Sequence, residues 1–201
     1  MDKSMMDKIY RPTGRNFDFA PGKKIYNLGC GKQNYPNTIG VDKVDNEILP
    51  NVKINHDLNI FPWPIADNSV DIVVAFHFLE HVDDLFKTIQ EMHRISKNGS
   101  KIIIEVPHFR YSSAFKDPTH KHFFTCKTIN YFCKENHSFT NLPFQINLTD
   151  LSIGWPTTNK FSLKYWVKKW LEKRKNQDLY DNIFYFFIQS NILVFELDVK
   201  K

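Results

Sequence analysis

The sequence predicts an α/β fold built on a mostly parallel β-sheet, with an antiparallel pair of strands at one edge. Five short runs rich in β-branched residues recur through the first half of the chain, and two later runs alternate apolar and polar residues. A segment with helical spacing lies between the fourth and fifth runs. Strands that alternate with helices are typical of parallel sheets. At 201 residues the chain is most simply one domain with a sizeable core.

The five early runs are predicted to be strands covered on both faces, because several are nearly continuous in Val and Ile. They comprise residues 24–30, 38–43, 52–58, 70–76 and 101–107. The helical segment before the fifth run carries apolar residues at Leu85, Ile89, Met92 and Ile95. Asp83 or Asp84 can cap this helix and Asn98-Gly99 can end it. The segment therefore predicts a βαβ unit.

The two later runs, residues 144–153 and 192–199, predict the antiparallel edge pair. Between them, residues 154–191 form an insertion rich in lysine and aromatic residues. Its segment 160–175 holds seven Lys or Arg against one Glu, a local charge of +6, whereas the whole chain carries +5. The basicity therefore belongs to one segment, and the composition does not indicate a specific nucleic-acid partner.

An apolar stripe at helical spacing runs through the basic segment. It consists of Leu163, Trp166, Val167, Trp170 and Leu171. We expect this stripe to pack on the protein's own core, with the lysines in solvent. Two alternatives remain open from the sequence: a lid over an acceptor site, or a surface that meets anionic lipid, phosphorylated glycan or nucleic acid.

The cysteine content and the hydropathy of the sequence argue against a disulfide framework and a membrane-spanning helix. The three cysteines are too few and too irregularly spaced for a disulfide framework. The N-terminus lacks the apolar stretch of a signal peptide, and no run reaches the length of about 18 apolar residues that a spanning helix needs. We expect a soluble cytoplasmic protein, whose oligomeric state the sequence leaves open.

A strand that runs into Gly-x-Gly is the strongest local signal of a ligand site. In IYNLGCGK, residues 25–32, Gly29 and Gly31 directly follow the first predicted strand. Glycines there let the backbone turn sharply and expose N–H groups to a ligand. Asp42 ends the next strand, where a carboxylate can accept hydrogen bonds from a ribose diol. Each signal alone also fits a plain turn or a capping residue.

Four segments in a fixed order carry a resemblance to a known family. They read NLGCG, then VD, then HDL followed by FPWPIADNSVDIVVAFHFLEHV, then ISKNGSKIIIEVP. Over residues 24–107 the chain resembles the class I S-adenosylmethionine-dependent methyltransferases, in particular the type 11 methyltransferase-domain group. The resemblance implies a Rossmann-like, mostly parallel seven-stranded sheet with an antiparallel edge pair and helices on both faces.

The resemblance also implies an organisation of the chain within one methyltransferase domain. Residues 1–23 would form an N-terminal cover segment, and residues 24–153 the cofactor-binding core. Residues 154–191 would be the insertion, and residues 192–201 the last strand. The implied cofactor is S-adenosylmethionine, with methyl transfer onto an oxygen or nitrogen of the acceptor. A small molecule, a sugar or a lipid-linked compound fits as acceptor, and the basic insertion favours an anionic one.

The family's binding residues can be carried over position by position. Gly29 and Gly31 would pass beneath the amino-acid part of the cofactor, and Asp42 would hold the ribose hydroxyls. The remaining implied cofactor contacts are Asn27, Asp57, Leu58, Phe76 and His77. Asn27 stands where the family more often has an acidic residue. Only residues 31–37 separate the first two strands, so the helix that usually lies there must shrink to about one turn.

The pentapeptide HFLEH, residues 77–81, has two incompatible interpretations. H-x-x-E-H is the inverted zinc-protease signature, which needs His77, Glu80 and His81 on one helix. In the methyltransferase interpretation, His77 closes a strand beside the cofactor and Glu80 and His81 begin a helix. We favour the second, and the sequence then suggests no metal. A zinc hydrolase and a non-catalytic scaffold with a methyltransferase fold remain the alternatives.

Two histidines after the fifth strand are candidates for acid or base chemistry. His120 lies in DPTH, a stretch that also resembles some members of the family, and His108 lies in EVPHF. Histidine titrates near working pH, so either side chain can deprotonate or orient an acceptor. The spacing of His120, Cys126 and Cys133 is not that of a zinc site.

Overall fold

The computed structural model describes residues 8–10, 16–19, 21–45, 47–133, 145–154, 163–187 and 190–201. Parts of the predicted N-terminal cover segment (1–7, 11–15 and 20) and of the insertion (155–162, 188 and 189) lie outside these residues. The strands are β1 (Lys8–Tyr10), β2 (Asn16–Asp18), β3 (Ile25–Leu28), β4 (Thr38–Asp42), β5 (Val52–Asn55), β6 (Val70–Phe76), β7 (Ser96–Pro107), β8 (Gln145–Ile153) and β9 (Ile192–Lys200). The helices are α2 (Leu85–Ile95), α3 (Ser113–Lys116), α4 (Leu163–Leu171) and α5 (Gln177–Asn182), with 3₁₀ turns η1 (Leu79–His81), η2 (Thr128–Phe132), η4 (Arg174–Asn176) and η5 (Phe184–Phe186).

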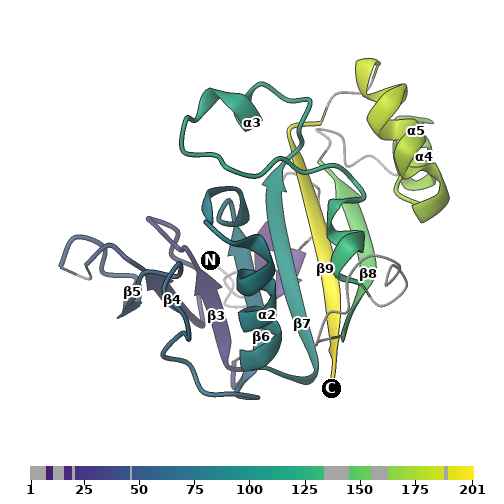
Figure 1. The fold of residues 1–201 in the computed structure, drawn as a ribbon. Coiled ribbons are helices and arrows are strands. Elements are labelled where there is room, and N and C mark those ends of the chain that lie inside the picture. The colour runs from purple at the N-terminus through teal and green to yellow at the C-terminus, as the bar shows by residue number, and fades with distance from the viewer. Residues whose placement is uncertain are drawn as a thin grey trace.

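Seven strands form one sheet in the order β5-β4-β3-β6-β7-β9-β8 (Figure 1). The strands from β5 to β7 are parallel neighbours, and β9 runs antiparallel to both β7 and β8. The predicted fold class is therefore confirmed: the sheet is mostly parallel, with an antiparallel pair at one edge. The carboxyl ends of β3, β6 and β7 point to the same edge, above which the α3 segment lies (Figure 1).

The helix between β6 and β7 begins where the sequence predicts and ends earlier. The Asp84 side chain caps α2 by accepting a hydrogen bond from the Lys87 N–H at 3.0 Å. The helix stops at Ile95, before the predicted Asn98-Gly99. The hydroxyl of Ser96 donates to the Met92 carbonyl at 2.6 Å, and β7 starts at Ser96 itself.

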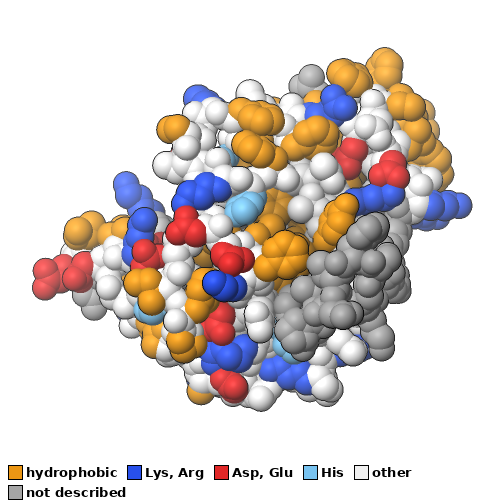
Figure 2. Space-filling view, in the orientation of Figure 1, with side chains coloured by type: hydrophobic (Ala, Val, Ile, Leu, Met, Phe, Trp, Pro, Cys, Tyr) orange, Lys and Arg blue, Asp and Glu red, His pale blue; other side chains and the backbone are white. Residues whose placement is uncertain are grey.

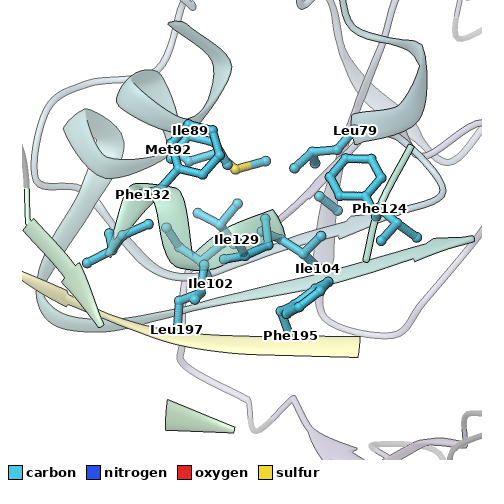
Figure 3. Packing of buried hydrophobic residues seen from close by; sticks show 14 of the residues in the cluster. Leu79, Ile89, Met92, Ile102, Ile104, Phe124, Ile129, Phe132, Phe195 and Leu197 are labelled. Carbon is cyan, nitrogen blue, oxygen red and sulfur yellow. The ribbon is translucent and has the colours of Figure 1, made fainter. Parts of the chain in front are cut away.

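One large apolar cluster joins the sheet to its covering helices. Ile89 and Met92 of α2 and Ile129 and Phe132 of η2 pack over Ile102 and Ile104 of β7 and Phe195 and Leu197 of β9 (Figure 3). All eight side chains are buried. This burial, rather than helix propensity, holds α2 on the sheet.

The other face of the sheet is covered differently from the expectation of helices on both faces. A smaller buried cluster there contains Phe19 with side chains of β3, β6, β7 and β9, and Tyr35 packs against it. None of these described residues is helical. The physical reason is the short connection from β3 to β4, which leaves no room for a crossover helix.

The orientation expected for the apolar stripe in α4 is wrong. Leu171 is buried, but Trp166 and Trp170 expose 64% and 42% of their surface. Lys168, expected in solvent, is buried beside Glu172, with 3.5 Å between Nζ and Oε1. The helix thus buries Lys168 with its carboxylate partner and exposes both tryptophans. Among the helices in the described part of the chain, we find none with the length and apolar character required to cross a membrane.

The packing of β7 yields a stability prediction. Ile104→Ala should lower the free energy of unfolding by about 2–5 kcal/mol, because a fully buried side chain leaves a cavity. The control Ile48→Ala should change it by less than about 0.5 kcal/mol, since Ile48 is exposed. Urea denaturation measures both, and equal losses would contradict the described core.

Candidate functional site

Two neighbouring cavities lie where the parallel strands end. The first, of about 490 Å³, is lined by loops that follow β3, β4, β5 and β6, and by Thr119 and Lys121 after β7. The second, of about 600 Å³, is lined by the segments that follow β6 and β7. Both cavities are lined by His77 and His81. Ligands of open α/β sheets bind at this edge, so the pair of cavities is the candidate site.

The glycine loop after β3 adopts the conformation that the sequence predicts. Gly29 and Gly31 have φ of +61° and +47°, in the left-handed region that glycine tolerates. The Gly31 N–H donates to Oδ2 of Asp42 at 2.8 Å. The side-chain amide of Asn51 donates to the carbonyls of Gly31 and Gln33 at 2.8 and 2.9 Å. These bonds hold the loop in place of the missing first helix.

Gly29 is also required for close packing. A Cβ built on it would lie 2.3 Å from Cδ2 of Phe78, far inside van der Waals contact. Phe78 itself lines the first cavity. Sequence reasoning missed Phe78, and it also missed Asn51, which lines neither cavity but holds the glycine loop. The tight Gly29 turn after β3 is the one feature that could have indicated a bulky neighbour above it.

The predicted acidic residues converge on the first cavity. Asp42 and Asp57 line it together with Leu58. The second oxygen of Asp42 accepts the Val44 N–H at 3.1 Å, and Asp57 accepts the Asn59 N–H at 3.0 Å. A carboxylate offers about four acceptor positions, so each retains capacity for a ligand.

Asn27 carries an unmet hydrogen-bonding capacity. It is buried in β3, and among the described residues neither atom of its amide has a hydrogen-bond partner. Leaving such a group unpaired costs about 1–3 kcal/mol. Asn27 is not among the residues that line either cavity, but it precedes the Gly29 turn by two positions. A polar ligand group at this turn would relieve the cost.

Phe76 lies away from both cavities, contrary to the expectation that it contacts the cofactor. Its ring is buried in the cluster on the second face of the sheet, edge-on to Tyr35 at 5.7 Å between centroids. Its backbone carbonyl, rather than its ring, faces the loop and accepts from Gln33 at 3.3 Å.

His77 stands between the cavities and carries a positive charge. Its φ of +54° turns the chain sharply as it leaves β6. Burial lowers the pKa of its imidazole, but hydrogen bonds to Glu105 and Glu80 outweigh that effect and raise the pKa to about 9. The nitrogen–oxygen distances are 3.3 and 3.2 Å. A cation therefore forms part of the wall between the two cavities at neutral pH.

The HFLEH segment does not form the single helix of a zinc protease. His77 is in the left-handed turn after β6, whereas Glu80 and His81 belong to the short 3₁₀ turn η1. The two histidines therefore do not share a regular helical face. The structure instead brings Glu80 and His81 next to His120, across 39 residues of sequence.

The two candidate acid/base histidines have different positions. His120 lines the second cavity, with Nδ1 at 2.8 Å from the Ala114 carbonyl and its ring 4.7 Å from that of His81. His108 is fully buried, bonds Asp181 at 2.9 Å and lines neither cavity. The arrangement supports contact with a ligand for His120 and does not support it for His108.

Comparison with known proteins finds methyltransferases. Residues 18–104 match a family model described as a methyltransferase domain. A demethylmenaquinone methyltransferase of Geobacillus sp. (strain WCH70) is 32% identical over 84 residues, which cover 42% of this chain and 35% of that protein. One of Alkalihalophilus pseudofirmus is 34% identical over 65 residues, or 32% of this chain and 27% of that protein. The chain thus spans about a third of the length of these curated relatives.

The similarity in fold covers more of the chain than the similarity in sequence does. The crystal structure of a SAM-dependent methyltransferase from Archaeoglobus fulgidus superposes with a TM-score of 0.53 at 20% identity, covering 88% of this chain and 86% of that one. The chain is related to the class I S-adenosylmethionine-dependent methyltransferases. S-adenosylmethionine is the cofactor that this relationship implies. The open acceptor positions of Asp42, the glycine turn and the unpaired amide of Asn27 fit such a ligand.

The glycine loop after β3 yields a second prediction. Gly31→Ala should cost about 1–2 kcal/mol of stability, since its Cβ meets open space and only φ is strained. Gly29→Ala should cost about 1–3 kcal/mol more, because its Cβ also collides with Phe78. Urea denaturation of both variants tests this, and an equal cost would mean that Phe78 does not lie against Gly29.

Proposed function

We propose that the protein is an S-adenosylmethionine-dependent methyltransferase that acts on an oxygen or nitrogen of an acceptor in the second cavity. The observation that carries this proposal is the shared wall: His77 and His81 line both cavities. A cofactor in the first and an acceptor in the second would meet there. Alignment of two bound reactants is the main contribution a protein makes to such a transfer.

Binding of the cofactor is assigned to residues of the first cavity. Asp42 would accept hydrogen bonds from the ribose hydroxyls, and Asp57 from the adenine amino group while Leu58 packs against the ring. Gly29 would let the backbone approach the amino-acid part, near the amide of Asn27. S-adenosylmethionine supplies an electrophilic methyl group when bound. The supporting observations are the positions of the lining residues and the free acceptor capacity of both carboxylates.

The acceptor side is assigned to the second cavity. His120 lies in its wall and would orient the acceptor or take its proton. Lys116 lines the same cavity, and the positive charge of His77 is shared with the first. Glu80 and Asp117 lie in the same lining, so its charges do not by themselves select an anion, and we propose a small-molecule, sugar or lipid-linked acceptor. The relatives named for demethylmenaquinone are matched over about a third of their length, so that quinone is one acceptor to test.

An exposed aromatic surface suggests contact with the lipid part of an acceptor or with a membrane surface. It comprises Leu163, Trp166, Trp170, Phe186 and Phe187. Figure 2 shows hydrophobic side chains gathered over α4 and α5 at the upper right. The half-exposed Lys169 and the exposed Lys173 lie in the same segment. Tryptophan beside lysine is typical of helices that lie at the surface of anionic membranes.

Cofactor binding is tested with Asp42→Asn. Loss of the carboxylate should weaken S-adenosylhomocysteine binding by about tenfold or more, roughly 1.4 kcal/mol. Asp45→Asn is the matched control, because that exposed carboxylate caps Glu47 in a nearby turn and lines neither cavity. Isothermal titration calorimetry measures all three proteins. No binding by the wild type would leave the scaffold alternative, and an unchanged affinity in Asp42→Asn would refute the assigned ribose contact.

The membrane-surface proposal has a separate test. The double variant Trp166→Ser, Trp170→Ser should lose most of its co-sedimentation with phosphatidylglycerol vesicles. Ile48→Ser, which removes an exposed apolar residue elsewhere, should bind as the wild type does. Failure of the wild type to bind these vesicles would end the proposal.

A further inference from the structure

We propose that Glu80, His81 and His120 form a binding site for a divalent transition-metal ion in the wall of the second cavity. One potential ligand atom from each residue lies within 4.8 Å of those of the other two. All three residues line that cavity. Two imidazoles and one carboxylate form the ligand set of catalytic zinc sites and of the facial triad of non-haem iron.

The hydrogen bonds of His81 leave Nε2 free to bind an ion. The hydroxyl of Thr119 donates its single proton to Oδ1 of Asp117 at 2.7 Å. Oγ1 of Thr119 lies 2.9 Å from Nδ1 of His81 and, with its own proton already donated, must accept from it. Nδ1 carries the proton, and the lone pair is on Nε2. The Thr119 hydroxyl, itself held by Asp117, takes the place of the carboxylate, carbonyl or water that usually orients a metal-binding histidine.

A different hydrogen-bond partner orients the imidazole of His120 in the same way. Its Nδ1 lies 2.8 Å from the backbone carbonyl of Ala114, which can only accept a hydrogen bond. Nδ1 is therefore protonated, and Nε2 carries the lone pair. A backbone carbonyl is the second common outer-shell partner of a metal-binding histidine.

Glu80 supplies an independent observation. Its side chain is 1% exposed, and Oε1 lies 3.2 Å from Nδ1 of His77. Oε2 is buried and has no hydrogen-bond partner among the described residues. An unpaired buried carboxylate oxygen is costly, and a bound cation would remove that cost.

The backbone around these side chains is fixed by contacts between the two segments. The Glu80 carbonyl accepts the N–H groups of Lys121 at 2.7 Å and His122 at 3.2 Å. The turn that carries Glu80 and His81 is thereby joined to the loop that carries His120. The three ligands are held together before any ion arrives.

A second group, His108, Cys126 and Asp181, also lies within 4.8 Å and does not support the same inference. Nε2 of His108 already bonds Asp181 at 2.9 Å. Burial raises the pKa of the Cys126 thiol well above its usual value, so the thiol stays protonated. All three are buried, and none lines either cavity.

Three protein ligands leave a coordination position toward the second cavity. An ion there would bind an acceptor hydroxyl and lower its pKa, with the proton passing to solvent. His120 would then act as a ligand rather than as a free base. This use of the ion rests on the proposed methyl transfer, whereas the binding site itself does not.

Cobalt titration tests the site directly. Protein freed of metal with EDTA should bind one Co²⁺ per chain and develop visible d–d absorption, and Zn²⁺ should displace it. His81→Gln and His120→Gln should each lower the Co²⁺ affinity by at least about tenfold, the loss expected for disturbing even an outer-shell partner. His122→Gln is the matched control: it lies on the same loop, bonds the Val82 carbonyl and is outside the cluster.

The outcomes separate this inference from the proposed function. Absence of stoichiometric Co²⁺ binding, or binding that survives in both histidine variants, would overturn the metal site. Glu80→Gln adds a third test, with thermal melting to confirm folding; if it does not fold, the histidine variants decide. S-adenosylhomocysteine binding is measured on the metal-free wild type, so a failure of cofactor binding with Co²⁺ binding intact would refute only the proposed function.

Discussion

The hydrogen bond from the Gly31 N–H to the carboxylate of Asp42 is the constraint on which the site depends. It joins the ends of β3 and β4, which are parallel neighbours connected without a helix. Asn51 holds the same loop from the other side through two backbone carbonyls. The Asp42 carboxylate thus shapes the loop and faces the first cavity at once. A residue with both roles explains how a short connection still forms a ligand-binding edge.

The second cavity follows from sheet topology. β6 and β7 are parallel neighbours, so the segments that leave them emerge at the same edge. The Glu80 carbonyl then bonds two backbone N–H groups of the later segment. His77 lies between Glu80 and Glu105, and its hydrogen bonds to these two carboxylates raise the pKa of its imidazole. The HFLEH and DPTH motifs, which lie apart in the sequence, therefore form one wall of the second cavity.

Much of the fold and of the candidate site was predictable from the sequence. The features that were not predictable have physical reasons. The buried strands were predictable because short runs of Val and Ile are typical of strands covered on both faces. Phe76 was misplaced, although strict alternation along β6 puts it on the face of Ile72 and Val74. The exposure of Trp166 was not predictable, because the apolar stripe does not reveal that Lys168 is buried beside Glu172. The meeting of His81 with His120 depends on how Thr119 and Asp117 orient side chains, which spacing does not encode.

On the proposed function, the first cavity holds the nucleoside of the cofactor. A crystal structure of the protein grown with S-adenosylhomocysteine tests it most directly. We expect the ribose hydroxyls on Asp42, the adenine beside Leu58 and the sulfur directed toward the wall formed by His77 and His81. Density for the ligand elsewhere, with Asp42 contacting only Gly31 and Val44, would contradict it.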